Sequence, residues 1–267
     1  LLNATNINFS GSLKSDYGSS YDFYDISENI IDLNFFSDDF QGWVQYEYSN
    51  PPDIGFTTND IRKFRLEYSK NNFNVKLGDI YEMWGRGLVL NQFDDQIMNF
   101  DNGTRGLYLE FNKGPYSFSQ INGVSDIWLM GAGNRVPDLN NFHNMAASKL
   151  SYSNDKFSLG LMSLRSNEEH QKMFGLDALV NHNIKGAYFT WLGSNADIFL
   201  EYADKISTEK TNLFENVPND TIKKGSGYYQ NINLYLKNWG LSTEYKRYSF
   251  DKAHGEFTAN NYGNQIE

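Results

Sequence analysis

The sequence predicts an all-β fold, an antiparallel up-and-down transmembrane β-barrel of about 14 strands that forms a single domain over residues 1–267. Three observations predict it: polar and apolar residues alternate, short and long connections alternate, and the composition is polar yet aromatic. Hydrophobic residues make up 40% of the chain and aromatic residues 16%. A barrel tolerates this composition because only one face of each strand must be apolar, whereas a soluble two-layer protein usually carries more aliphatic core residues.

Alternation with a period of two identifies the strands. In residues 63–68, for example, Phe64, Leu66 and Tyr68 alternate with charged residues. The expected strands are 6–16, 29–37, 40–49, 61–69, 73–82, 104–112, 115–123, 145–153, 156–165, 183–192, 196–204, 227–236 and 239–249. A further strand at 256–264 would run antiparallel to the first and bring the number to an even value, as single-chain bacterial barrels have.

The connections between these strands alternate in length. Tight polar turns are expected near 37–39, 70–72, 112–114, 153–155, 193–195 and 237–238, and longer polar loops at 17–28, 50–60, 83–103, 124–144, 166–182 and 205–226. The turns contain Asn, Asp or Gly, which tolerate the positive φ of short hairpins. This pattern predicts short periplasmic turns at one end and long external loops at the other. A soluble sandwich has no reason for such regularity, and a β-propeller needs four strands per repeat where only two fit.

Charge and composition exclude several classes of protein. The net charge of −10 argues against a nucleic-acid partner, because phosphates attract basic surfaces. The absence of cysteine excludes disulfides and thiolate metal sites. No stretch approaches the ~18–20 apolar residues of a membrane helix. The expected location is therefore the bacterial outer membrane, with outer-membrane lipid as partner and other outer-membrane or periplasmic proteins as further candidate partners.

The two faces of each strand should meet different surroundings. The apolar series is expected to face lipid, and the polar series to face the lumen of the barrel. Charged side chains in a lumen need partners or water, because their desolvation is costly. The alternative interpretation is the solvated face of a soluble sheet. The candidate lumen residues on the strands and at their ends are Lys63, Arg65, Glu67, Glu110, Glu201 and Lys237.

Residues 78–106 combine glycine, aromatic and charged residues more densely than the rest of the chain. Gly85 and Gly87 flank Arg86, which suggests a tight backbone passage or a bulge. A loop of this length is usually functional. We therefore expect residues 83–103 to fold inward and narrow the lumen. The charged residues expected to form an internal network there are Asp79, Glu82, Arg86 and Arg105.

The same segment resembles an uncharacterised family of Bacteroidetes outer-membrane β-barrel proteins. The resemblance rests on a Gly-x-x-Tyr-Glu-x-x-Gly-x-Gly element followed by an Asp-Asn-x-x-x-Gly element. The matching residues are Gly78, Tyr81, Glu82, Gly85, Gly87, Asp101, Asn102 and Gly106. The resemblance implies a barrel and supplies no activity. Family members are longer than this chain, which also ends in Gln-Ile-Glu rather than in the Phe or Trp of many outer-membrane proteins, so the closure of a barrel at residue 267 is left open.

Catalytic and metal-binding chemistry has little support in the sequence. The four histidines, His143, His170, His182 and His254, fall in expected loops or at strand starts and lack metal-binding spacing. Hard oxygen ligands for calcium could come from Asp94, Asp95, Asp101 and Asn102, which do not follow the EF-hand spacing. No motif joins a histidine to a nucleophilic serine. We therefore predict no cofactor, no metal and no enzymatic activity.

These observations favour a porin-like barrel that passes small solutes, with residues 83–103 narrowing the pore. The alternative is a non-conducting barrel that acts as a subunit or scaffold of a larger outer-membrane complex. A barrel enzyme is a third and weaker interpretation.

Overall fold

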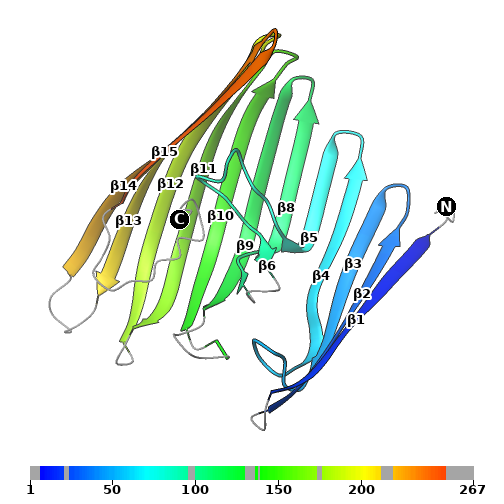
Figure 1. Ribbon diagram of the computed structural model, residues 1–267. Helices are drawn as coiled ribbons and strands as arrows, with labels where there is room; N and C mark the ends of the chain where they lie inside the picture. The colour runs from blue at the N-terminus through cyan, green and yellow to red at the C-terminus, as the bar shows by residue number, and fades with distance from the viewer. Residues whose placement is uncertain are drawn as a thin grey trace.

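The computed structural model describes residues 7–20, 24–95, 100–129, 136–137, 139–172, 176–211 and 219–250. All regular structure in these ranges is β (Figure 1). The strands are β1 (Asn8–Ser20), β2 (Tyr24–Phe36), β3 (Phe40–Ser49), β4 (Thr58–Lys70), β5 (Phe73–Ile80), β6 (Asp94–Asp95), β7 (Phe100–Asp101), β8 (Thr104–Lys113), β9 (Tyr116–Leu129), β10 (Leu139–Ser153), β11 (Phe157–Lys172), β12 (Leu176–Leu192), β13 (Ala196–Thr211), β14 (Asn219–Leu236) and β15 (Trp239–Phe250).

The main sheet is an antiparallel meander in which each strand pairs with its neighbour in sequence, and β5 pairs with β8 across the short β6–β7 hairpin. The connections at one end, which we call the turn end, have two or three residues each and lie where the sequence predicts them. Asn71 and Gly114 take positive φ there, at 53° and 57°. The all-β, up-and-down prediction is therefore confirmed. We call the opposite end the loop end.

The prediction of a closed sheet of about 14 strands is not met by the described residues. Thirteen strands form one open sheet, from β1 at one edge to β15 at the other. Because the number is odd, β1 and β15 run in the same direction, so they could not pair antiparallel with each other. The strand expected at 256–264 lies outside the described residues. No helix in the described ranges is long and apolar enough to cross a membrane.

The strands on the C-terminal side are longer than the sequence predicts. Loops were expected at 166–182 and 205–226, but β11 and β12 extend to Lys172 and from Leu176, and β13 continues to Thr211. The reason lies on the outer face. Toward the loop end, the outward positions become polar, so the apolar alternation stops although the backbone pairing continues.

The outer face of the sheet carries an apolar belt near the turn end. One row across neighbouring strands joins Phe118 to Leu150, Leu150 to Leu161, and Leu161 to Ala187. Leu161 is 64% exposed although its surroundings are apolar. Other exposed members of the belt are Leu33, Leu66, Leu77, Leu109, Leu159, Trp191, Tyr202 and Leu241. An exposed apolar surface this extensive marks a region that another phase or molecule covers.

A pair of substitutions on β11 tests whether lipid covers this belt. Leu161→Arg should destabilise the folded protein by about 2–4 kcal/mol if position 161 lies in hydrocarbon, and Asn167→Arg by about 0–1 kcal/mol because position 167 lies toward the loop end of the same face. The measurement is urea unfolding in lipid vesicles. Equal effects at the two positions would contradict a membrane belt.

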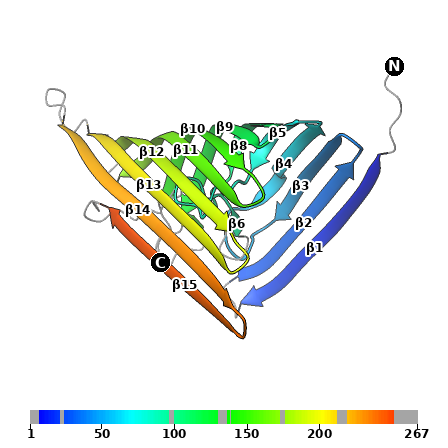
Figure 2. The same cartoon turned by 90° about the horizontal axis from the view of Figure 1, so that it is seen from above.

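The buried core lies on the other face of the sheet. Figure 2 shows the sheet curling so that the segment between β5 and β8 lies on its concave side, which we call the inner face. The core residues come from this segment and from inward positions of β8 to β14, among them Trp84, Leu90, Ile121, Leu164 and Ile184. Packing inside the curl therefore depends on one connection rather than on a second sheet.

Candidate functional site

The connection after β5 forms an inward hairpin, residues 81–93, which we call the inner hairpin. Trp84 N donates to Leu90 O at 3.0 Å, and Gln92 N donates to Glu82 O at 3.0 Å. Figure 1 shows the segment leaving β5 at the loop end and extending across the neighbouring strands toward the turn end. It is therefore an ordered element.

Apolar side chains fix the inner hairpin to the inner face. Trp84, Leu88, Val89 and Leu90 are at most 2% exposed. They belong to one cluster with inward residues of six strands, β8 to β13, and with Tyr229 of β14. Burial of such side chains contributes about 1.5–3 kcal/mol each, so the inner hairpin is held by contacts made along most of the C-terminal part of the sheet.

A glycine on the wall makes room for the tip of the inner hairpin. A Cβ added at Gly186, on β12, would lie 2.5 Å from Val89 Cγ2. Real side-chain carbons do not approach so closely, so only glycine allows Val89 to pack at this depth. The wall and the hairpin tip are thus complementary in shape at position 186.

The backbone of Gly85, Arg86 and Gly87 encloses a carboxylate from β13. Both glycines have positive φ, 63° and 87°. Glu201, which is 1% exposed, accepts hydrogen bonds from Arg86 N and from Leu88 N, the latter at 3.2 Å. Successive N–H groups that point at one anion form a nest. A buried carboxylate requires such donors, because an unpaired buried charge is costly.

A second ion cluster holds the base of the inner hairpin. The Lys63 ammonium group on β4 is 3% exposed and lies 2.7 Å from carboxylate oxygens of both Asp94 and Asp101. Tyr81 donates to Asp101 at 3.0 Å, and burial together with the neighbouring Asp101 and Asp94 carboxylates raises the pKa of Tyr81, so its hydroxyl remains a donor. Lys63 thus joins β6 and β7 to the main sheet.

The residues considered for calcium are used within the protein. The Asp94 and Asp101 carboxylates pair with Lys63. The Asn102 amide oxygen accepts from Phe93 N at 2.6 Å, and its amide nitrogen donates to Asn91 O at 2.8 Å. A positive charge therefore already stands between the two carboxylates. In the ranges that the structure describes, no group of three metal-ligating side chains occurs.

Several candidate lumen residues do lie on the inner face. Lys63, Glu110 and Glu201 alternate with outward apolar residues on β4, β8 and β13. Arg65 and Glu67 occupy inward positions on β4 next to Lys63, and the Glu67 carboxylate accepts from Asn74. Glu110 accepts hydrogen bonds from Tyr108 and Asn112. These side chains form the polar part of the inner wall.

The structure corrects the expected set of lumen residues at three positions: Arg105, Asp79 and Lys237. Thr104 of β8 points inward and is fully buried, so Arg105 lies on the outer face with Leu107. The Asp79 carboxylate pairs with Arg105, with Nε to Oδ1 at 2.9 Å, and accepts from Phe64 N at 2.7 Å. Lys237 stands exposed in the turn between β14 and β15. These three residues therefore do not line the inner face.

The expected network of Asp79, Glu82, Arg86 and Arg105 does not form. The Glu82 carboxylate lies 2.7 Å from the Lys76 ammonium group, and the Arg86 guanidinium lies over aromatic rings instead of a carboxylate. Charge alone could not assign these partners, because strand alternation and the hairpin conformation decide which side chains meet.

Two histidines that were expected in loops lie on the inner wall. His143 is 3% exposed on β10 and lies 3.1 Å from Ser166 Oγ through Nδ1. His182 on β12 lies 2.8 Å from Ser207 Oγ and 2.6 Å from Glu168 Oε2. The prediction was wrong because β10 and β12 extend past the apolar belt. Ser207 is itself buried, so we interpret this chain of hydrogen bonds as joining β11, β12 and β13 rather than as a catalytic triad.

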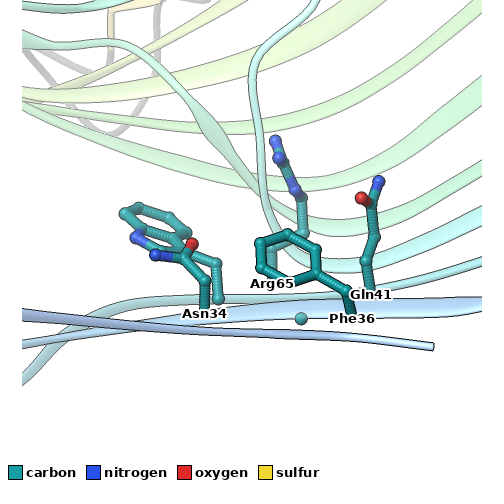
Figure 3. Close-up of a pocket in the computed structure, with 6 residues that line it drawn as sticks. Asn34, Phe36, Gln41 and Arg65 are labelled. Atoms are coloured by element: carbon teal, nitrogen blue, oxygen red, sulfur yellow. The ribbon is translucent and has the colours of Figure 1, made fainter. Parts of the chain in front are cut away.

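The N-terminal part of the inner face is less covered. Inward Ser12, Lys14 and Gln41 are exposed there. A shallow hollow of about 100 Å³ opens between β2, β3 and β4, and Figure 3 shows four of its side chains extending to the same side of the sheet. The hollow is lined by Asn34, Phe36, Gln41, Gly42, Trp43 and Arg65. The inner face therefore has a filled apolar side, over β8 to β14, and a polar side, over β1 to β4, where Gln45, Glu47 and Lys63 are buried but Ser12, Lys14 and Gln41 are exposed.

A comparison with models of known protein families finds a match. The model of one family, described as a family of unknown function (DUF6029), matches residues 24–266. The chain belongs to the DUF6029 family. The matched region contains the inner hairpin and every candidate residue discussed above. No curated protein matches this DUF6029 protein.

Solved structures match this DUF6029 protein at low sequence identity and with TM-scores below 0.5. A loop L8 deletion mutant of OmpT, an outer membrane protein of Vibrio cholerae, is 10% identical with a TM-score of 0.45, over 93% of this chain and 95% of that chain. An anion-selective porin from Comamonas acidovorans is 11% identical with a TM-score of 0.35, over 87% and 90% of the two chains. OccK3 (OpdO) of Pseudomonas aeruginosa is 11% identical with a TM-score of 0.28, over 92% and 90%.

Proposed function

We propose that this DUF6029 protein is an outer-membrane β-barrel that passes small solutes in the manner of a porin. The solutes would move through the part of the inner space that the inner hairpin leaves free. Two features support a membrane barrel: the apolar belt lies on the outer face, and the charged and hydrogen-bonding side chains named above lie mainly on the inner face. Transmembrane barrels have this distribution, with apolar residues outward and polar residues inward.

The observation that carries the proposal is the unequal filling of the inner face. The inner hairpin buries its apolar residues against β8 to β14, whereas inward Ser12, Lys14 and Gln41 on the other side remain exposed. A hairpin of this kind narrows a lumen without filling it. The described residues of the wall also carry charges of both signs, which suits a wet passage for polar solutes.

Closure of the sheet is part of the proposal. An open sheet edge does not occur in contact with hydrocarbon, because its backbone N–H and C=O groups would lack partners. One further strand, antiparallel to both β1 and β15, would close the sheet with an even number of strands.

Planar-bilayer recording tests the proposal. The full chain is folded in detergent, its folded state is checked by heat-modifiable migration in gel electrophoresis, and it is then added to a bilayer in KCl. The expected result is stepwise conductance. Folded protein that inserts into vesicles but gives no conductance would overturn the passage function.

A second candidate is a non-conducting subunit or scaffold of a larger outer-membrane complex. The open edges of β1 and β15 favour it, because an exposed edge can accept a strand from another chain. Two results together would support this function over passage of solutes. An envelope protein should co-purify stably, and its removal should expose these edges to crosslinking. The purified protein should also give no conductance.

A further inference from the structure

Arg86 is the one charged residue at the tip of the inner hairpin, and its side chain is exposed. Its neighbours Trp84 and Leu88 are 1% and 2% exposed. The Arg86 guanidinium carbon lies 5.4 Å from the ring centre of Phe199 and 5.7 Å from that of Tyr229. The hairpin thus turns its apolar residues into the wall and leaves a guanidinium group against two aromatic rings.

The nearby carboxylates are occupied by other donors. Glu201 accepts from the backbone N–H groups of Arg86 and Leu88, and a Glu244 oxygen lies 3.1 Å from the Lys246 ammonium group. Within the described ranges, the Arg86 side chain forms no ion pair with a carboxylate. Aromatic rings attract the positive charge but accept few of the five N–H groups of a guanidinium. The hydrogen-bonding capacity of Arg86 therefore faces the inner space.

The backbone on both sides of Arg86 has an unusual conformation that a buried carboxylate holds in place. Gly85 and Gly87 adopt positive φ, and the buried Glu201 carboxylate fixes the backbone between them. An arginine whose backbone is held in place, and whose side chain forms no ion pair within the described ranges although Glu201 and Glu244 lie near enough to act on it electrostatically, is suited to bind an anion from outside the protein.

More aromatic and basic groups surround Arg86. The Tyr188 and Phe199 rings stack at 6.2 Å, and Lys246 Nζ lies 5.6 Å from the centre of the Tyr229 ring. We call these residues the Arg86 patch: Arg86, Tyr188, Phe199, Tyr229 and Lys246. The patch combines two cations with three aromatic rings on the inner wall of β12 to β15 and the hairpin tip.

We propose that the Arg86 patch is a solute-binding site for aromatic carboxylates. The carboxylate pairs with the Arg86 guanidinium through two N–H···O bonds, a geometry that Arg favours. The aromatic part of the solute packs on the half-buried Phe199 ring, beside the buried Tyr229. This inference rests on the proposed function, since it names the class of solute that such a passage would select.

Isothermal titration calorimetry of the detergent-folded full chain with benzoate tests the site. Benzyl alcohol serves as the neutral probe of similar shape. We expect saturable binding of benzoate and none of benzyl alcohol. Arg86→Gln should weaken benzoate binding by about tenfold or more, because it removes a charge-assisted pair, and Arg86→Lys should weaken it less. The control is Arg165→Gln, which removes the same charge from the outer face and should leave binding unchanged.

The outcomes separate this site from the passage function. Benzoate binding that depends on Arg86, in a protein that does not conduct, would leave the site intact and overturn the passage function. Conductance without saturable benzoate binding, or equal binding by wild-type protein and Arg86→Gln, would overturn the site. Folding of each variant is checked by heat-modifiable migration.

Discussion

Replacing residues 84–90 with a Gly-Ser-Gly linker should raise the single-channel conductance of the protein severalfold. The tip of the inner hairpin is the bulkiest element on the inner face, and Trp84 alone is the largest fully buried side chain. Barrels without such plugs leave an aqueous channel. The measurement is single-channel current in KCl, compared with the wild-type protein under the same voltage.

The same replacement should lower the stability of the folded protein. The replacement removes four buried side chains, each of which contributes about 1.5–3 kcal/mol to stability: Trp84, Leu88, Val89 and Leu90. It also exposes the inward apolar residues of β8 to β13 to water. Urea unfolding in vesicles measures this loss. A point variant, Met83→Ala, provides the control because Met83 is 58% exposed on the same hairpin and should change neither stability nor conductance.

A substitution on the wall should displace the hairpin without altering its sequence. Gly186→Leu places a side chain where even a Cβ would lie 2.5 Å from Val89, so the hairpin tip must move. Ala187→Leu is the matched control, because Ala187 points to the outer face on the same strand. Conductance that rises in Gly186→Leu and not in Ala187→Leu would locate the constriction at the hairpin. Unchanged conductance in both the linker replacement and Gly186→Leu would contradict it.

The sheet could be predicted from the sequence because its causes are local. Alternation assigned Leu107 and Leu109 to the outer face and Glu110 to the inner face, and the structure places them there. The turns were identified by residues such as Asn71 and Gly114, whose positive φ follows from residue type. Each of these inferences needs only a few consecutive residues.

Strand length and the direction of charged residues were not predictable in the same way. Apolar alternation reports the extent of the apolar belt rather than the extent of backbone pairing. β11 and β12 therefore continue beyond it, and His143 and His182 lie on the wall instead of in loops. Arg105 was expected inside because it is charged, yet a charged side chain at the margin of the belt can lie outside when a partner such as Asp79 is within reach.

The contact that fixes the inner hairpin joins residues more than a hundred positions apart. Gly85, Arg86 and Gly87 suggested a tight backbone passage, and Glu201 suggested an inward charge, but nothing in either segment indicates that the two meet. That contact depends on the position of β13 opposite the hairpin, which only the assembled sheet provides. Arg86 and Glu201 could thus be named from the sequence, whereas their contact could not.

Glu201→Gln should release the tip of the inner hairpin. The carboxylate uses both oxygens, one for Arg86 N and one for Leu88 N. In Gln an NH₂ group replaces one oxygen and cannot accept a hydrogen bond, so one buried N–H group loses its partner at a cost of about 1–3 kcal/mol. Hydrogen–deuterium exchange of the peptide that contains residues 84–90 should accelerate accordingly. Glu169→Gln, on the exposed outer face, should leave that exchange unchanged.

A double-mutant cycle with Gly85→Ala separates this contact from a general loss of stability. A Cβ at position 85 would lie 2.6 Å from Glu201 Oε2, at a φ of 63°. Gly85→Ala should therefore destabilise the wild-type hairpin through both the clash and the strained φ. In a Glu201→Ala background the clash is absent and only the φ cost remains, so the two substitutions together should cost less than the sum of each alone. Additive costs would mean that Glu201 does not hold the Gly85–Gly87 backbone, and the positioning of Arg86 would then need another cause.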